Sequence, residues 1–386
     1  MRSLRFPRIP LTVATAFLAC AAAHAQQERV LKLTVNPSGF ASSLASHARK
    51  SAVHLMQANT PAGWAAKRRS RLSTPMSPMD GPGGAGFGGE SWGWSAGGTR
   101  YPGDLQYHGG QVVQSAKEIL IFVNTPASGS CDSIATCWGH PHQFLSDLGS
   151  SRFIHIVDQY VQAHDGDRYR PSRDIIQVSY PATSPITGTS TYSDLDMQTI
   201  VYDVVSELGL PAGYHAIYDI FLPPGQDECT GAMSCYSPDD PGTFVFCAYH
   251  GTAMLPGIGD TLYAVEPFQN VGGCSVRPDT PNGPLVDSTD NVLSHETIET
   301  ITDPNVAGDW PTGWWNELAN GMFGQEIGDE CSFLQWTPAP PATPGTSPTV
   351  YFDPSAVDLN GRGYAIQPEY SNSQHGCATS PGDDLE

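Results

Sequence analysis

The segment LSHETIETITDP, residues 293–304, is the stretch that best indicates both a main helix and a chemistry. His295 and Glu299 are four residues apart, so on a helix their side chains lie on one face, one turn from each other. The same spacing separates the two zinc ligands of the H-E-x-x-H motif, whose Glu in second place is the general base. Here Glu299 takes the place of the second His, and a carboxylate is also a zinc ligand. The segment predicts a metal-binding helix with Glu296 as base, or else a solvated helix face.

A third ligand is expected from the acidic segment GQEIGDEC, residues 324–331. Two protein ligands are too few for a tetrahedral ion, and Glu326 follows Glu299 by 27 residues. We therefore predict zinc on His295, Glu299 and Glu326, with water in the fourth position.

Alternatives to Glu326 remain open at this point. Asp303 stands before Pro304, where the helix should end, and Asp329 lies in the acidic segment. His250 ends a predicted strand. Any of the three could replace Glu326 as a ligand, or could orient the other ligands by hydrogen bonds. A calcium site built from the acidic oxygens is a further alternative.

Residues 1–25 have the pattern of a secretory signal peptide. A basic start is followed by the short apolar run 11–22 and by Ala23-His24-Ala25, an A-x-A cleavage site. The apolar run is too short to span a bilayer. We therefore expect an extracellular or periplasmic protein.

Charge divides the chain. Up to Arg71 there are eleven Lys and Arg and one acid, whereas from Leu72 onward there are eight Lys and Arg and 38 acids. We predict that residues 26–71 form a basic pro-segment, cut near KRRSR (67–71), which binds the acidic body of its own chain. The alternative is a basic surface arm that stays attached. Residues 72–105 read as a Gly-rich linker.

The acidic body, residues 106–386, is expected to form one catalytic-type domain and to act as a monomer. Its strong negative charge argues against nucleic acid and anionic membranes as partners.

Eight cysteines follow the predicted signal peptide, and an even number in an exported chain indicates disulfides. Eight cysteines allow 105 pairings. The short loops 131–137 and 229–235 are the first pairs expected, and Cys331–Cys377 would hold the C-terminal tail.

Strand-like and helix-like stretches alternate along the body. Strands are predicted at 118–124, 174–181, 214–223, 243–250 and 261–268, and helices at 142–150, 193–208 and 288–302. Ser193 is the expected N-cap of the second helix, with Asp196 in the capping-box position. This alternation predicts one α/β or α+β domain with a mixed sheet.

Several of these pieces resemble the EXORDIUM, or phosphate-induced, protein family of plants and its bacterial relatives. They are YHGGQVV (107–113) leading into EILIFVN (118–124), SDLGSSRF (146–153), VLSHETIETITDP (292–304) and EIGDEC (326–331). The family is similar to divergent zincin-type metallopeptidases. The resemblance therefore implies a zincin-like, disulfide-stabilised domain and supports a site on His295, Glu299 and Glu326. It also implies an extracellular or cell-wall location.

The function expected from these observations is a secreted zinc endopeptidase made as a zymogen. Zinc would activate a water molecule, Glu296 would take its proton, and a polypeptide would be the substrate. One alternative is a non-catalytic wall protein with a structural metal. Another is a glycosidase that uses Glu296 and Glu326 as paired carboxylates.

Overall fold

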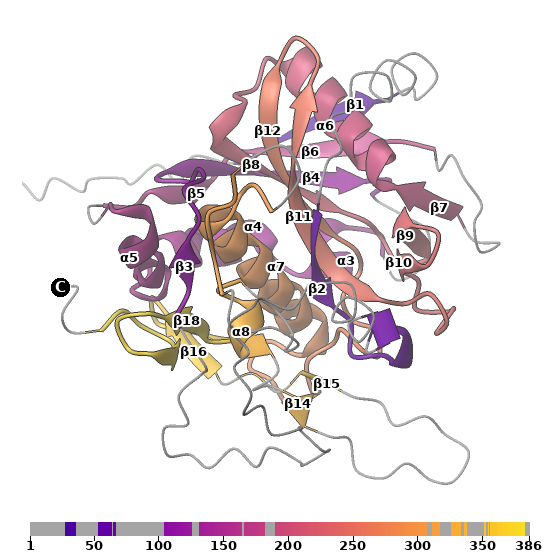
Figure 1. The fold of residues 1–386 in the computed structure, drawn as a ribbon. Coiled ribbons are helices and arrows are strands. Elements are labelled where there is room, and N and C mark those ends of the chain that lie inside the picture. Colours follow the sequence, from indigo (N-terminus) through magenta and orange to yellow (C-terminus); the bar gives the residue numbers. More distant parts are fainter. Residues whose placement is uncertain are drawn as a thin grey trace, which may run out of the picture.

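The computed structural model shows a large mixed β-sheet with helices on both faces (Figure 1). Its description covers residues 28–35, 53–63, 65–66, 104–125, 131–163, 166–181, 190–306, 311–316, 326–332, 336–337, 351–352, 354 and 356–382. The predicted signal peptide, the basic cluster 67–71 and all but the last two residues of the predicted linker lie outside the described residues.

The main sheet has eight strands, seven of them in the order β1-β6-β4-β8-β12-β11-β2, with β5 paired to β4. In this order, β1, β6, β4, β8 and β12 are parallel to one another. β11 is antiparallel to β12, and β2 is antiparallel to β11. Their bounds are Arg29–Thr34 (β1), Asp174–Ser179 (β6), Ala116–Val123 (β4), Gly213–Phe221 (β8), Gly259–Glu266 (β12), Phe246–Leu255 (β11), Val53–Gln57 (β2) and Tyr169–Pro171 (β5).

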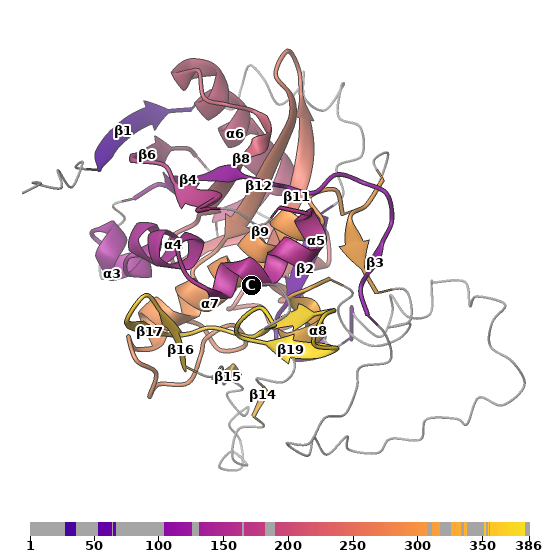
Figure 2. The same cartoon turned by 90° about the vertical axis from the view of Figure 1, so that its left-hand side faces the viewer.

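The two faces of the sheet bury alternate residues of each strand. In β4, Ile119 and Ile121 belong to a cluster with helix α6 (Asp194–Leu208). The alternate residues Leu120 and Phe122 pack in a second cluster. That cluster includes α3 (Ile134–Trp138), α4 (Pro141–Gly149), α5 (Asp158–Val161), the 3-10 helix Phe153–Val157 and α7 (Pro284–Thr302). Figure 2 shows α6 on one side of the sheet and α4, α5 and α7 on the other. Because side chains alternate along a strand, the central strands are apolar on both faces.

The predicted mixed α/β class is confirmed. The strands and helices expected from 118–124 to 288–302 are all present, with bounds shifted by a few residues. Helix α6 begins as predicted: the backbone N–H of Ser193 donates to Oδ2 of Asp196 at 2.8 Å. The zincin-like identity of the fold stays a prediction.

The two described strands of the basic N-terminal segment belong to the main sheet. β1 pairs with β6 at one edge and β2 pairs with β11 at the other. Val35 and Met56, which adjoin or lie in these strands, are buried in the core. The segment therefore completes both edges of the sheet, and its removal in the mature protein stays a prediction.

The remaining strands form small sheets around this framework. They are the three-stranded sheet β10-β9-β7 (Ser234–Tyr236, Gln226–Gly231, Ser190–Ser193) and the pairs β13-β3 (Trp314–Trp315, Gln106–Tyr107), β14-β15 (Trp336–Thr337, Tyr351–Phe352), β16-β17 (Ala356–Leu359, Arg362–Ala365) and β18-β19 (Glu369–Ser371, Gly376–Ala378).

All eight cysteines after the predicted signal peptide form disulfides. The three expected pairs are confirmed, and the fourth bond joins Cys247 to Cys274. Four disulfides are typical of an oxidising compartment such as the cell exterior. Within the described residues, no helix is long and apolar enough to cross a membrane.

Candidate metal centre

Helix α7 begins and ends where the sequence places a helix start and stop. Pro284 is its first residue, and Gly283 before it has a φ of 82°, a conformation that suits glycine. Asp303 ends the helix and Pro304 follows it. Every residue from Asp287 to Thr302 is buried. The alternative of a solvated helix face is therefore wrong.

A buried helix with this many polar residues needs partners, and the C-terminal part of the chain supplies some of them. The backbone N–H of Ala365 donates to Asp287 at 3.1 Å, and that of Gln367 donates to Asn291 at 2.8 Å. These bonds fix the β17–β18 region along the helix. They leave the residues one turn further on, from His295 to Glu299, for other contacts.

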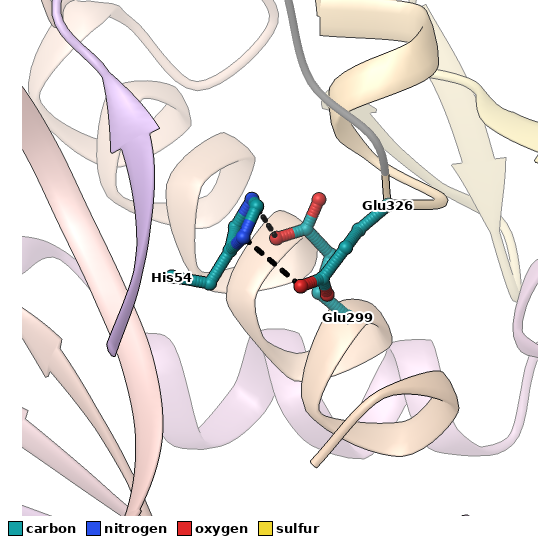
Figure 3. Close-up of side chains that lie close together, drawn as sticks. All are labelled: His54, Glu299 and Glu326. Carbon is teal, nitrogen blue, oxygen red and sulfur yellow. Dashed lines mark ion pairs between the residues drawn. The ribbon is translucent and has the colours of Figure 1, made fainter. Parts of the chain in front are cut away.

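Side chains from four parts of the chain meet at this turn of α7. The helix contributes His295, Glu296 and Glu299; β2 contributes His54 and β11 contributes His250. The fourth part is the segment 326–332, which ends in the short helix α8 (Asp329–Ser332) and carries Glu326 and Asp329. Figure 3 shows His54, Glu299 and Glu326 pointing toward one another.

One oxygen of Glu299 lies at the centre of this cluster. Its Oε2 is 3.2 Å from Nε2 of His295, 3.8 Å from Nδ1 of His250 and 4.0 Å from Nε2 of His54. Its other oxygen accepts a hydrogen bond of 2.9 Å from the backbone N–H of Asp329. Ligand atoms around a tetrahedral ion with bonds near 2.0–2.1 Å lie about 3.3 Å apart. The distance from Glu299 to His295 matches this value, and those to His250 and His54 are about 0.5 to 0.7 Å longer.

The other contacts bring the acidic segment and the two strand histidines into the same place. Nδ1 of His54 is 3.0 Å from Oε1 of Glu326, and its Nε2 is 2.7 Å from Oδ2 of Asp329. Nδ1 of His250 is 3.0 Å from Oε2 of Glu296, and its Nε2 is 3.5 Å from Oε2 of Glu326.

Three groups within the described residues have ligand atoms that all lie within 4.8 Å of one another. They are His54, Glu299 and Glu326; His250, Glu296 and Glu299; and His295, Glu299 and Asp329. Glu299 belongs to all three. His295 is therefore grouped with Asp329, and Glu326 with His54, so both acids are candidates for the third ligand.

Several polar atoms of the cluster are buried and make no hydrogen bond within the described residues. They are both ring nitrogens of His295, Oε2 of Glu299, Oε2 of Glu326 and Oε1 of Glu296. Buried polar atoms without partners are rare in folded proteins because each costs about 1–3 kcal/mol. A bound cation would give the carboxylate oxygens and one ring nitrogen of His295 a partner. The predicted metal site therefore fits these residues.

The pKa shifts follow from burying so many acids and histidines together. Burial raises the pKa of Glu296 to about 8, and the nearby His295 and His54 partly offset this effect. Burial also lowers the pKa of His250 to about 3. The pKa of Glu326 is raised well above its ordinary value, again by burial. Without a cation the acids therefore tend to hold protons, so metal binding should release them.

Local backbone features hold the acidic segment against the helix. A Cβ on Gly328 would lie 2.6 Å from Nδ1 of His295, so only glycine allows this approach. The Cys331–Cys377 disulfide ties the segment to β19, and Cys247–Cys274 holds β11 three residues before His250. Asp303 lies just beyond α7; its Oδ1 accepts a 2.6 Å bond from Gly313, and its carbonyl lies 3.2 Å from His250.

Sequence reasoning placed every member of the cluster except His54. Its strand, VHLMQ, lies in the segment expected to be a pro-segment, and the spacing in α7 gives no hint of it. His54 is aligned with His250 on the neighbouring strand, so both point to the same face. A histidine inside a short apolar strand was the one signal available.

Comparisons of the chain with protein families, with curated proteins and with solved structures found no match. The buried His and Glu cluster is therefore the main basis for a function.

Proposed function

We propose that the protein is a secreted metal-dependent hydrolase, specifically a zinc endopeptidase. His295 and Glu299 would hold the ion, together with Glu326 or Asp329. The observation that carries the proposal is that Oε2 of Glu299 makes no hydrogen bond within the described residues but has three histidine nitrogens within 4.0 Å. When bound, the metal would supply a Lewis acid at the centre of the cluster.

Glu296 is the proposed general base. It follows His295 on α7, as the base follows the first ligand in H-E-x-x-H. One of its oxygens contacts His250, which orients the carboxylate, and the other makes no hydrogen bond within the described residues. Without a cation, burial raises the pKa of Glu296 to about 8, and a cation bound beside it would lower this pKa and favour the carboxylate that accepts a proton.

We further propose kinship with the EXORDIUM family, on the sequence segments that resemble it. An extracellular location and a polypeptide substrate are parts of the same proposal. The signal-like N-terminus and the four disulfides support the location.

The test is the Glu296→Gln variant, which removes the base and keeps the shape of the side chain. We expect hydrolysis of an unfolded polypeptide such as denatured casein to fall by roughly 10²–10⁴-fold, with metal content unchanged. Activity should be measured on the intact secreted chain and on chain cut at the basic cluster 67–71. Glu228→Gln is the matched control, because Glu228 is also fully buried but contacts Tyr249 and not the cluster. Absence of hydrolysis in both forms of the wild type would refute the peptidase.

A second candidate function is a non-catalytic protein with a structural metal. Its support is the burial of the candidate ligands, since structural zinc sites are closed. Metal that is retained in wild type and in Glu296→Gln, with no hydrolysis by either, would favour this candidate.

A further inference from the structure

His54 differs from the other members of the cluster in where it comes from. It lies on β2, the last strand at its edge of the sheet, within the basic segment 26–71. The other members lie in the acidic body, on α7, on β11 and in the 326–332 segment. The candidate centre is thus built by two parts of the chain with opposite charge.

His54 is also the outermost member of the cluster. Its side chain is 21% exposed, whereas those of His250, His295, Glu299, Glu326 and Asp329 are at most 9% exposed. Its ring spans Glu326 and Asp329, with one nitrogen within 3.0 Å of each acid. In Figure 3 its ring approaches the carboxylates of Glu299 and Glu326 from the side opposite the backbone of Glu326. His54 therefore stands between the buried ligands and solvent.

The number of candidate ligands indicates what His54 could do at this position. A catalytic zinc site has three protein ligands and one open position, whereas a structural site is closed by a fourth. Helix α7 offers His295 and Glu299, and the 326–332 segment offers a third. Two strand histidines could supply the fourth. Both ring nitrogens of His250 already contact Glu296 and the carbonyl of Asp303, at 3.0 and 3.2 Å. The imidazole of His54 on β2, 4.0 Å from Oε2 of Glu299, would therefore be the fourth.

We propose that His54 closes the metal centre and that the N-terminal segment is an internal inhibitor of the protein's own active site. This inference rests on the proposed hydrolase. The inhibitor of the hydrolase is a segment of the same chain, and His54 is the residue that occupies the fourth, open position of the zinc.

Charge and sheet pairing support this role independently of the ligand count. Residues 26–71 carry eight Lys and Arg and one acid, whereas residues from 72 onward carry 38 acids and eight Lys and Arg. Opposite charges favour association of the segment with the body. The pairing of β2 with β11 over residues 53–57 holds His54 in register with His250.

The experiment compares the full-length secreted protein with its His54→Ala variant, both loaded with zinc. Three quantities are measured: zinc per chain, the rate at which a chelator removes zinc, and inhibition of zinc loss by acetohydroxamate, a small zinc-binding probe. His142→Ala is the matched control. The side chain of His142 is 22% exposed and contacts Glu28 of the same segment at 3.2 Å, but it lies outside the cluster.

The expected result is unchanged zinc content in His54→Ala with faster zinc removal, by about tenfold or more, the scale on which groups around a metal change its binding. The hydroxamate should protect the zinc of this variant and not that of the wild type or of His142→Ala. Casein hydrolysis should rise in His54→Ala. If alanine prevents folding, His54→Gln, which also removes the imidazole, gives the same comparison.

Two results would overturn the inference. Loss of zinc in His54→Ala would make His54 an obligatory ligand, and behaviour identical to wild type would leave it without a role at the centre. The outcome for the hydrolase is separate. If the variant shows an accessible zinc but no hydrolysis, His54 closes the site as inferred and the proposed peptidase fails.

Discussion

One row of residues across the main sheet passes through two very different buried polar regions. His54, His250, Ala264, Asp219 and Leu120 are aligned on successive strands and face the same side, toward α7. At the β2 edge the row meets α7 and forms the His and Glu cluster. Toward the centre it meets a second group, made of carboxylates alone.

The second group consists of Glu118, Asp219 and Glu266, which lie on a diagonal across β4, β8 and β12. All three are buried, and their carboxylate oxygens make no hydrogen bond within the described residues. Burial raises the pKa of each well above its ordinary value. No candidate metal group within the described residues includes any of them.

The difference separates a candidate metal site from a plain group of buried acids. Both groups bury carboxylates at a cost that the fold must offset. At the edge, histidine nitrogens and a well-placed helix turn bring ligand atoms to coordination distance. At the centre, no histidine joins the acids in a candidate ligand group within the described residues, and burial raises their pKa values, so they are expected to stay protonated, which removes their charge.

Of the changes considered, removal of the metal should lower stability most. The loss should come from the His and Glu cluster and not from the central acids. A ligand present at a thousand times its dissociation constant adds about 4 kcal/mol of stability. For a domain of this size we expect a strong chelator to lower Tm by on the order of 10 °C. The same drop is expected in Asp219→Asn, because the central acids hold no metal. A wild-type Tm that does not change with the chelator would show that the His and Glu cluster holds no more metal than the central acids do.

A smaller effect is expected from Gly328→Ala, which disturbs the edge cluster without touching a ligand. The new methyl group would press on the ring of His295 and displace the acidic segment. We expect zinc affinity to fall by roughly 10–100-fold while the protein stays folded. Gly231→Ala is the control, since its Cβ would meet nothing within 4 Å. Equal zinc affinity in the two variants would show that the segment 326–329 is not part of the centre.

The smallest effect concerns the central acids and depends on pH. Burial raises the pKa of Asp219 in the folded protein, so the folded state holds a proton that the unfolded chain releases. Its contribution to stability is therefore full below the unfolded pKa and is lost as pH rises toward the folded one. Each unit of pKa shift is worth about 1.4 kcal/mol.

Asp219→Asn removes this titration. Its Tm should exceed that of the wild type at pH 8 and match it more closely at pH 4. The exposed Asp239→Asn should leave the pH profile unchanged. Parallel profiles for wild type and Asp219→Asn would show that the central acid is not held protonated.

The same contrast separates what the sequence could predict from what it could not. The candidate ligands on α7 were predictable because their spacing is local, and a helix turn places His295 and Glu299 together whatever the rest of the fold. Three disulfides followed from short loops and position in the chain. The central strands followed from apolar runs with turns between them.

His54 and the central acids could not be predicted in this way. The place of His54 depends on which strand pairs with β11, a contact between residues almost 200 positions apart. The burial of α7 was also hidden, because the helix has Thr, Ser, Asp and Glu on the faces that a buried helix usually fills with apolar residues. Buried polar helices of this kind are expected at functional sites, where the residues needed for function replace the apolar residues that burial usually requires.

Metal analysis of the purified secreted protein beside its Glu299→Ala variant tests the central claim most directly. Glu299 belongs to each of the three groups of candidate ligands, so its loss affects any ligand set that the cluster could form. The account predicts about one zinc per chain in the wild type, as expected for one tetrahedral site, and almost none in Glu299→Ala. A wild type with well under one metal ion per chain, or a variant that keeps its metal, would contradict it.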